Sequence, residues 1–144
     1  RPMRKFIWLL AFGLWTALIF YNSSLPGTQS HQASWWLTDV AEQLGSVFVG
    51  FPPAAVLERG LRKLAHFFEY FCQGLLACRL FGVYGWSRRA SHGYILLAGL
   101  LTAVFDEYLQ TVVPGRNAAI ADILLDFVGT LTSWGTWQIT HWKR

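Results

Sequence analysis

The stretch RKLAHFFEYFCQGLLACRLF, residues 62–81, combines two properties that rarely occur in one helix. Most of it is apolar enough to lie inside a lipid bilayer. Its first turns nevertheless carry four ionisable side chains, those of Arg62, Lys63, His66 and Glu69. A charge near the centre of a bilayer costs roughly 2.5–3.5 kcal/mol even on a lenient insertion scale, so ionisable residues of membrane helices usually face protein partners. The stretch therefore predicts a membrane helix whose polar end faces other helices.

The composition of the chain agrees with a membrane protein. Of its 144 residues, 53% are hydrophobic and 14% are charged, whereas about 25% of the residues of a soluble domain are charged. The apolar residues gather in runs of roughly the length that a spanning helix needs, at residues 6–21, 64–81, 94–113 and 118–139. Backbone hydrogen bonds must be satisfied internally in lipid, which favours helices. We therefore expect an all-α fold, an integral membrane four-helix bundle that forms a single domain over residues 1–144.

The positions of the basic residues predict an orientation in the membrane. The net charge of +4 does not come from one patch, so it does not predict binding to nucleic acid. With four crossings, eight basic residues fall on one side: Arg1, Arg4, Lys5, Arg79, Arg88, Arg89, Lys143 and Arg144. The positive-inside rule makes that side cytoplasmic. Both termini are then cytoplasmic, and the segment 22–62 and the turn 114–117 lie outside.

The long outer segment contains a further predicted helix, at about residues 35–49. Its apolar residues recur at helical spacing, at Trp36, Val40, Leu44 and Val47. The sequence Phe51-Pro52-Pro53 is expected to stop this helix. Two placements fit the pattern equally well: an amphipathic helix in the membrane interface, or a lid packed on the bundle.

Polar residues gather at the outer ends of three predicted membrane helices. The ionisable ones are His66 and Glu69 in the second helix, Asp106 and Glu107 in the third, and Asp122 and Asp126 in the fourth. Five carboxylates at one depth cannot all stay charged in a dry site, so protons, nearby cations or a metal ion must neutralise some of them. The residues form either a functional site or a set of interhelical contacts that hold the bundle together.

The same residues suggest a chemistry. Arg62, Lys63 and Arg116 would hold a phosphate group at the mouth of the site, with arginine offering a bidentate contact. His66 would exchange a proton with the reacting oxygen. The candidate catalytic residues are His66, Glu69, Asp106, Glu107 and Asp122, and Gln110 is a candidate for substrate binding.

A divalent metal ion is the cofactor that these residues could hold. The candidate ligands are Asp106, Glu107, Asp122 and Asp126, with His66 beside them. Carboxylate oxygens with one imidazole suit magnesium, manganese or zinc. Zinc is the least favoured, because the chain has no His-Glu-x-x-His motif and no cysteine pair at ligand spacing. Cys72 and Cys78, six positions apart in one apolar run, are interpreted as packing residues.

Three motifs carry a family resemblance. They are Ser23-Ser24-Leu25-Pro26-Gly27, Arg62-Lys63-Leu64-Ala65-His66-Phe67-Phe68-Glu69-Tyr70, and Asp106-Glu107-Tyr108-Leu109-Gln110 continuing through Pro114-Gly115-Arg116 to Asp122. With these motifs the sequence resembles the VanZ-like family of small bacterial integral membrane proteins, over about residues 6–135. The resemblance implies a multispanning protein of the bacterial cytoplasmic membrane, with some members linked to teicoplanin resistance. It adds Ser23, Ser24 and Tyr70 to the candidate substrate-binding residues, whereas Asp126 stands where the family pattern has asparagine.

Two functions from different classes fit these residues. The first is an enzyme of the outer leaflet that hydrolyses or transfers a phospho-group of a membrane lipid or lipid-linked envelope precursor. The second is a protein that binds an anionic lipid or a glycopeptide without changing it. Ion or proton movement is less favoured, because the ionisable residues end halfway across the membrane. The enzyme is slightly preferred, and the sequence predicts no oligomeric state.

Overall fold

The computed structural model describes residues 2–47, 50 and 52–141. Its helices are α1 (Pro2–Ser24), α2 (Gly27–Gly45), α3 (Ala54–Tyr84), α4 (Arg88–Thr111) and α5 (Ile120–Thr140). No strand occurs within these described ranges. The all-α class is confirmed, with five helices in the order that the sequence predicted.

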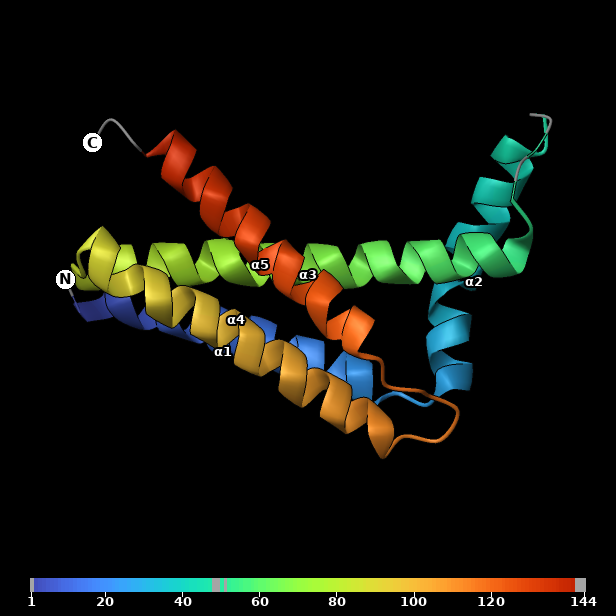
Figure 1. The fold of residues 1–144 in the computed structure, drawn as a ribbon, viewed down its shortest axis with the longest axis horizontal. Coiled ribbons are helices and arrows are strands. Elements are labelled where there is room, and N and C mark those ends of the chain that lie inside the picture. The colour runs from blue at the N-terminus through green and yellow to red at the C-terminus, as the bar shows by residue number, and fades with distance from the viewer. Residues whose placement is uncertain (1, 48–49, 51, 142–144) are drawn as a thin grey trace.

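Helix α3 is the centre of the molecule. It runs along the long axis in Figure 1 and contacts each of the other four helices. Helix α5 crosses it, α1 and α4 lie side by side along one flank, and α2 stands across its N-terminal part. Tyr70 of α3 packs with Ile19 of α1 and Ala103 of α4, and all three are fully buried. The helix that carries the polar end of residues 62–81 therefore has protein neighbours along its length.

The start of α1, the end of α5 and the α3–α4 turn lie at the same end of the bundle (Figure 1). Lys5 Nζ lies 5.2 Å from the centre of the Tyr84 ring, and the Arg79 guanidinium lies 5.4 Å from the centre of the Trp8 ring. The α1–α2 connection and the α4–α5 loop lie at the other end. Basic residues from α1 and α3 thus gather at one end of the bundle.

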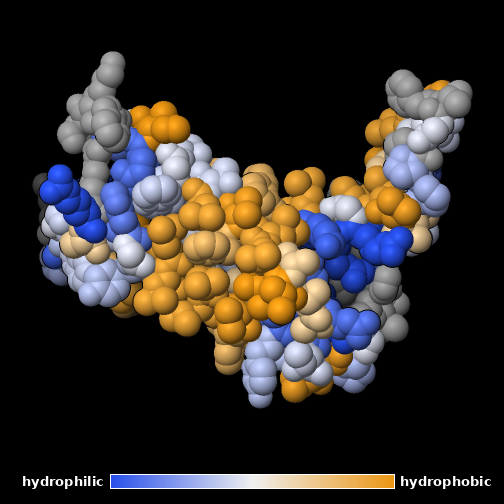
Figure 2. All heavy atoms as spheres, viewed as in Figure 1, coloured by the Kyte–Doolittle hydropathy of each residue, from blue (hydrophilic) through white to orange (hydrophobic). Residues whose placement is uncertain are grey.

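The distribution of polar and apolar side chains is inverted relative to a water-soluble protein. Among the described residues, six hydrophobic side chains are buried, compared with eleven polar or charged ones. Large apolar side chains are exposed along α1, α3, α4 and α5. Figure 2 shows an apolar band across the middle of one face, with polar surface towards both ends. This pattern is typical of helices that face lipid and keep polar groups between them.

By length and composition, α1 is the one helix in the described part of the chain that could span a membrane. The structure therefore confirms the helices but not the prediction that four of them span. The polar side chains that α3, α4 and α5 bury against one another lower the average hydropathy of those helices. Composition alone consequently does not identify them as spans.

Two helices begin well before the apolar runs that predicted them. Helix α3 starts at Ala54 instead of residue 64, directly after Pro53, because proline readily opens a helix. Helix α4 starts at Arg88 instead of residue 94, and the hydroxyl of Ser87 caps it by accepting a hydrogen bond from Ala90 N at 3.2 Å. The apolar run marks the part of a helix that suits lipid, whereas capping residues set its ends. Helices α1 and α5 differ from their predicted bounds by four residues or fewer.

Helix α2 covers residues 27–45 instead of the predicted 35–49. It begins directly after Pro26, and its first turns are polar, so hydrophobic spacing did not reveal them. Residues 48 and 49 and the predicted stop at Phe51 lie outside the described residues. Helix α2 contacts α3, which agrees with a lid on the bundle. It leaves Trp36 and Leu44 exposed, which agrees with a helix in the membrane interface.

Small residues set the close crossing of α5 over α3. A Cβ atom on Gly129 of α5 would collide with the carbonyl oxygen of Phe67 and the side chain of Tyr70. A Cβ atom on Gly74 of α3 would collide with Ser133 of α5. Close approach at small residues is common between membrane helices. The crossing brings the polar face of α5 against α3.

Gly129→Ala should destabilise the protein, whereas Gly135→Ala should not. The added methyl group must displace the α3 backbone, and such overpacking costs about 1–3 kcal/mol. This cost exceeds the gain of about 1 kcal/mol that alanine brings to a helix. Gly135 lies in the same helix with no atom within 4 Å of an added Cβ. Thermal unfolding in detergent measures the difference, and equal midpoints for the two variants would contradict the close crossing.

Candidate functional site

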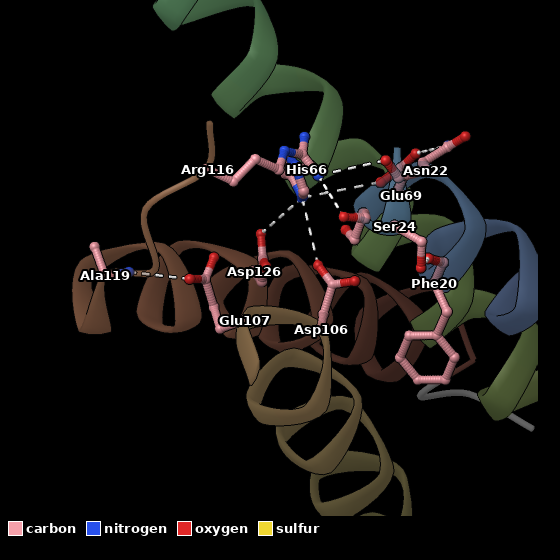
Figure 3. A network of polar contacts seen from close by, with 11 residues as sticks. Phe20, Asn22, Ser24, His66, Glu69, Asp106, Glu107, Arg116, Ala119 and Asp126 are labelled. Atoms are coloured by element: carbon pink, nitrogen blue, oxygen red, sulfur yellow. Dashed lines mark hydrogen bonds and ion pairs between the residues drawn. The ribbon is translucent and has the colours of Figure 1, made fainter. Parts of the chain in front are cut away.

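Three helices bring their ionisable side chains together around one imidazole. His66 Nδ1 of α3 lies 4.0 Å from Glu69 Oε2, 3.9 Å from Asp106 Oδ2 of α4 and 3.8 Å from Asp126 Oδ1 of α5 (Figure 3). These distances suit ion pairs with a protonated imidazole and are too long for hydrogen bonds. The predicted meeting of polar residues from three helices is therefore confirmed. We call His66, Glu69, Asp106 and Asp126 the imidazole cluster.

The imidazole cluster is buried unevenly. The side chains of His66 and Glu69 are 17% and 19% exposed, whereas those of Asp106 and Asp126 are 0% and 1% exposed. None of the side-chain oxygens of Asp106 and Asp126 has a hydrogen-bond partner. A buried carboxylate without such partners is costly. These two groups therefore require a proton or a compensating positive charge.

Helix α1 contributes a polar contact that the sequence prediction missed. Asn22 Nδ2 donates a hydrogen bond to Glu69 Oε1 at 2.6 Å. Trp15 Nε1 donates to the backbone carbonyl of Glu69 at 2.9 Å. Asn22 follows the apolar run 6–21 directly, and its place at the outer end of that run was the available signal. The contact holds Glu69 while its second oxygen, Oε2, lies near His66.

A pocket of about 280 Å³ adjoins the imidazole cluster. It opens between α3, α4, α5 and the α4–α5 loop, and its lining residues are Arg59, Arg62, Lys63, His66, Glu107, Gln110, Gly115, Arg116, Asn117, Asp122, Leu125 and Asp126. Arg59 and Asn117 were not predicted, although each lies close in sequence to a predicted basic residue. Four basic side chains thus share the lining with the imidazole, and Glu69 and Asp106 lie outside the lining.

Arg116 ties the α4–α5 loop to α1. Its Nη1 donates hydrogen bonds to the carbonyl oxygens of Ser23 at 2.7 Å and Asn22 at 3.4 Å. Burial lowers the pKa of Arg116 from its ordinary value, and the positive charge of Arg62 lowers it further. A guanidinium nevertheless stays charged at neutral pH. Gly115, with a φ of 77°, permits the turn that precedes Arg116. The loop therefore fixes a cation beside the pocket.

Two predicted site carboxylates make contacts at the start of α5. Glu107 Oε2 accepts a hydrogen bond from Ala119 N at 3.0 Å, and Asp122 Oδ1 lies 3.0 Å from Lys63 Nζ. The Glu107 contact satisfies an N–H group at the helix N-terminus, and Asp122, in the first turn of α5, places a negative charge where the helix favours one. Both residues line the pocket, but neither belongs to the group of metal-ligating atoms around His66. Of the four predicted carboxylate ligands, Asp106 and Asp126 therefore lie with His66, whereas Glu107 and Asp122 do not.

The remaining predicted residues lie at different depths. Gln110 lines the pocket. Tyr70 and Ser23 are fully buried, and their hydroxyl groups face Asp106 without forming a hydrogen bond of regular geometry. The hydroxyl of Ser24 donates to the carbonyl of Phe20 at 2.7 Å (Figure 3). The structure thus places Ser24 apart from the pocket.

Uncharged polar contacts continue the polar interior beyond the imidazole cluster. Gln73 Nε2 donates hydrogen bonds to Thr16 Oγ1 at 2.9 Å and to Thr102 Oγ1 at 3.1 Å, which joins α3 to α1 and α4. Thr130 and Ser133 of α5 are also buried. Polar groups therefore continue into the inner part of the bundle. The groups there are amides and hydroxyls, which act as structural contacts between helices.

The Asn22–Glu69 contact should contribute more to stability than the Lys63–Asp122 pair. A hydrogen bond to a charged group contributes about 1.5–3 kcal/mol, whereas an exposed ion pair contributes about 0–1 kcal/mol. The side chain of Lys63 is 58% exposed and that of Asp122 is 32% exposed. Double-mutant cycles with alanine at each pair measure the two coupling energies. A larger coupling for the Lys63–Asp122 pair would show that the order is wrong.

The sequence of this bundle matches one family of known proteins. A model of the family described as VanZ/LLP1 matches residues 8–141. This range includes every member of the imidazole cluster and every residue that lines the pocket. No curated protein and no solved structure gives a significant match to the chain. The chain belongs to the VanZ/LLP1 family.

Proposed function

We propose that the protein binds the phosphate-bearing headgroup of a bacterial envelope lipid, or of a lipid-linked envelope precursor, and hydrolyses or transfers the phosphate-linked group. The observation that carries this proposal is the pocket lining, in which Arg62, Lys63 and Arg116 stand beside His66. Arginine side chains bind phosphate through two parallel hydrogen bonds. A volume of about 280 Å³ lies at the small end of ligand pockets and suits a headgroup.

His66 is the residue proposed to move a proton. Its ring lines the pocket, and its Nδ1 lies near carboxylates of three helices. Glu69 or Asp106 would orient the imidazole and stabilise its protonated form. In hydrolysis, a water oxygen forms a bond to phosphorus while the P–O bond of the ester breaks. His66 gives its proton to the leaving oxygen, and the attacking water gives one to a pocket carboxylate.

A membrane setting for α1, α3, α4 and α5 is part of this proposal. The exposed apolar side chains of these helices and the buried polar ones support it, as does membership of the VanZ/LLP1 family. With four crossings, the end that carries Lys5 and Arg79 lies in the cytoplasm. The pocket then opens at the outer leaflet of the cytoplasmic membrane, where envelope precursors are accessible.

Binding without reaction is the second candidate function. Among the described residues that line the pocket, none is serine, threonine, cysteine or tyrosine, so no hydroxyl or thiol nucleophile faces a bound headgroup. Glu107 and Asp122 already have partners at the start of α5. A pocket of this kind would hold an anionic lipid or a glycopeptide and leave it unchanged. Ion transport has less support, because the buried groups beyond the cluster, Gln73, Thr102 and Ser133, carry no charge.

Cysteine labelling tests the orientation. In a Cys72→Ala, Cys78→Ala background, Asn117→Cys should react with a membrane-impermeant maleimide in intact cells. Arg89→Cys should react only after lysis. Both positions are exposed, and the two native cysteines are free and must be removed. The reverse labelling pattern would place the pocket on the cytoplasmic side and contradict the proposed access to the outer leaflet.

Mass spectrometry of lipids tests the binding and the reaction. Arg62→Gln and Arg116→Gln should each reduce co-purified anionic lipid at least tenfold, because each removes a charge-assisted contact of roughly 1.5–3 kcal/mol. Arg89→Gln, the same change at the opposite end of the bundle, should leave it unchanged.

Incubation of the protein with bacterial envelope lipids separates the two candidate functions. A change in lipid mass made by the wild type and not by His66→Gln identifies an enzyme and the bond it alters. Lipid that binds through Arg62 and Arg116 but keeps its mass identifies a binder. Lipid binding that is the same in all variants contradicts both functions.

A further inference from the structure

We infer that His66, Asp106 and Asp126 form a binding site for one divalent metal ion of the manganese or zinc type. The three residues come from three different helices. One potential ligand atom from each, the imidazole Nδ1 and a carboxylate oxygen from each aspartate, lies within 4.8 Å of the others. A use of the ion in the reaction rests on the proposed function and would replace the role of His66 as proton donor, because a ring that binds a metal ion through Nδ1 is not a protonated imidazole. The binding of the ion does not rest on that function.

The geometry of the three residues is close to that of a metal site. Bonds of about 2.0–2.2 Å to a metal ion place neighbouring ligand atoms about 3.0–3.5 Å apart. His66 Nδ1 lies 3.9 Å from Asp106 Oδ2 and 3.8 Å from Asp126 Oδ1. Side-chain movements of about 1 Å would bring the three atoms, which lie within 4.8 Å of one another, to ligand distances.

The candidate ligand atoms supply a second observation, because His66 Nδ1 and both side-chain oxygens of Asp106 and of Asp126 are buried without a hydrogen-bond partner. The hydroxyl groups of Tyr70 and Ser23 are fully buried, face Asp106 and have no hydrogen-bond partner. Carboxylates that bind a metal are themselves usually hydrogen-bonded by outer residues that orient them. Tyr70 and Ser23 are placed to serve Asp106 in this way.

The competing arrangement is a protonated His66 that acts as the counter-ion. It would supply one positive charge to three carboxylates, those of Glu69, Asp106 and Asp126. The nearby charges are those of Arg116, Arg62 and Asp122, of which Asp122 is paired with Lys63. A divalent ion balances both aspartates, and Glu69 keeps its hydrogen bond from Asn22. The metal arrangement therefore compensates both aspartates without a proton on either of them.

The three ligands favour particular metal ions, and the position of His66 and Asp126 in the pocket lining would give a bound ion access to the pocket. One imidazole with two carboxylates suits manganese or zinc, whereas calcium takes six to eight oxygen ligands. His66 and Asp126 both line the pocket, and Arg62 and Arg116 line the same space. An ion held by three residues would keep open positions towards that space. A phosphate oxygen held by the arginines would be the natural further ligand.

Manganese binding to the purified full chain tests the site. Protein stripped with a chelator and desalted in detergent should bind one Mn²⁺ per chain, as measured by the loss of the free Mn²⁺ signal in electron paramagnetic resonance. Asp106→Asn and Asp126→Asn should each weaken binding at least tenfold. Asp39→Asn is the matched control, because it is the same change in α2, outside the pocket that adjoins the imidazole cluster. This control variant should bind Mn²⁺ with the same affinity as the wild type.

A spectroscopic measurement on the wild type removes any dependence on the folding of the variants. Pulsed electron paramagnetic resonance of bound Mn²⁺ should show coupling to an imidazole nitrogen, and Zn²⁺ should displace the Mn²⁺. Absence of Mn²⁺ and Zn²⁺ binding at millimolar concentration would overturn the inference. A bound ion without nitrogen coupling would also overturn it. No lipid is present in these measurements, so their failure is distinct from a failure of the lipid-binding measurement above.

Discussion

The burial of two carboxylates without hydrogen-bond partners is the constraint on which the rest of the structure depends. Asp106 and Asp126 sit between helices whose outer faces are apolar, so they cannot turn outward for solvation. They meet His66 because α5 crosses α3 closely at Gly129 and α4 packs against both. The close packing of the helices therefore holds the imidazole cluster together. A wider crossing of α5 over α3 would move Asp126 away from His66.

Opposite charges lie in two neighbouring layers of the site: the basic residues that line the pocket form one, and the imidazole cluster forms the other. The basic side chains of Arg62, Lys63 and Arg116 line the pocket. Of the two most deeply buried carboxylates, Asp126 lines the same pocket and Asp106 lies beyond its wall. Two of the basic residues pair with carboxylates outside the imidazole cluster, Lys63 with Asp122 and Arg62 with Glu58 at 3.2 Å. The two layers meet at His66 and Asp126, which line the pocket and belong to the cluster. An anion in the pocket and a cation in the cluster would complete each layer, and this is the physical basis for combining a phosphate ligand with a metal ion.

Sequence reasoning identified most of the cluster but not its partners. Helical periodicity brought His66, Glu69, Asp106 and Asp126 to one depth, and the structure brings all four together. The same reasoning missed Asn22, because a lone amide at the end of an apolar run has no periodic signal. It also treated Glu107 and Asp122 as equivalent to the other carboxylates. Both instead serve the start of α5, which depends on where the α4–α5 loop turns.

The sequence by itself determined the helical class, the common depth of the ionisable residues and the resemblance to a family that the comparison then established. These properties follow from local periodicity, composition and motif spacing. The tertiary structure decided which carboxylates surround His66 and which cap a helix. It also decided that Arg59 and Asn117 join the pocket and that Ser24 does not. Periodicity fixes the face of a residue on its own helix, but helix rotation and crossing depend on contacts between residues far apart in the chain.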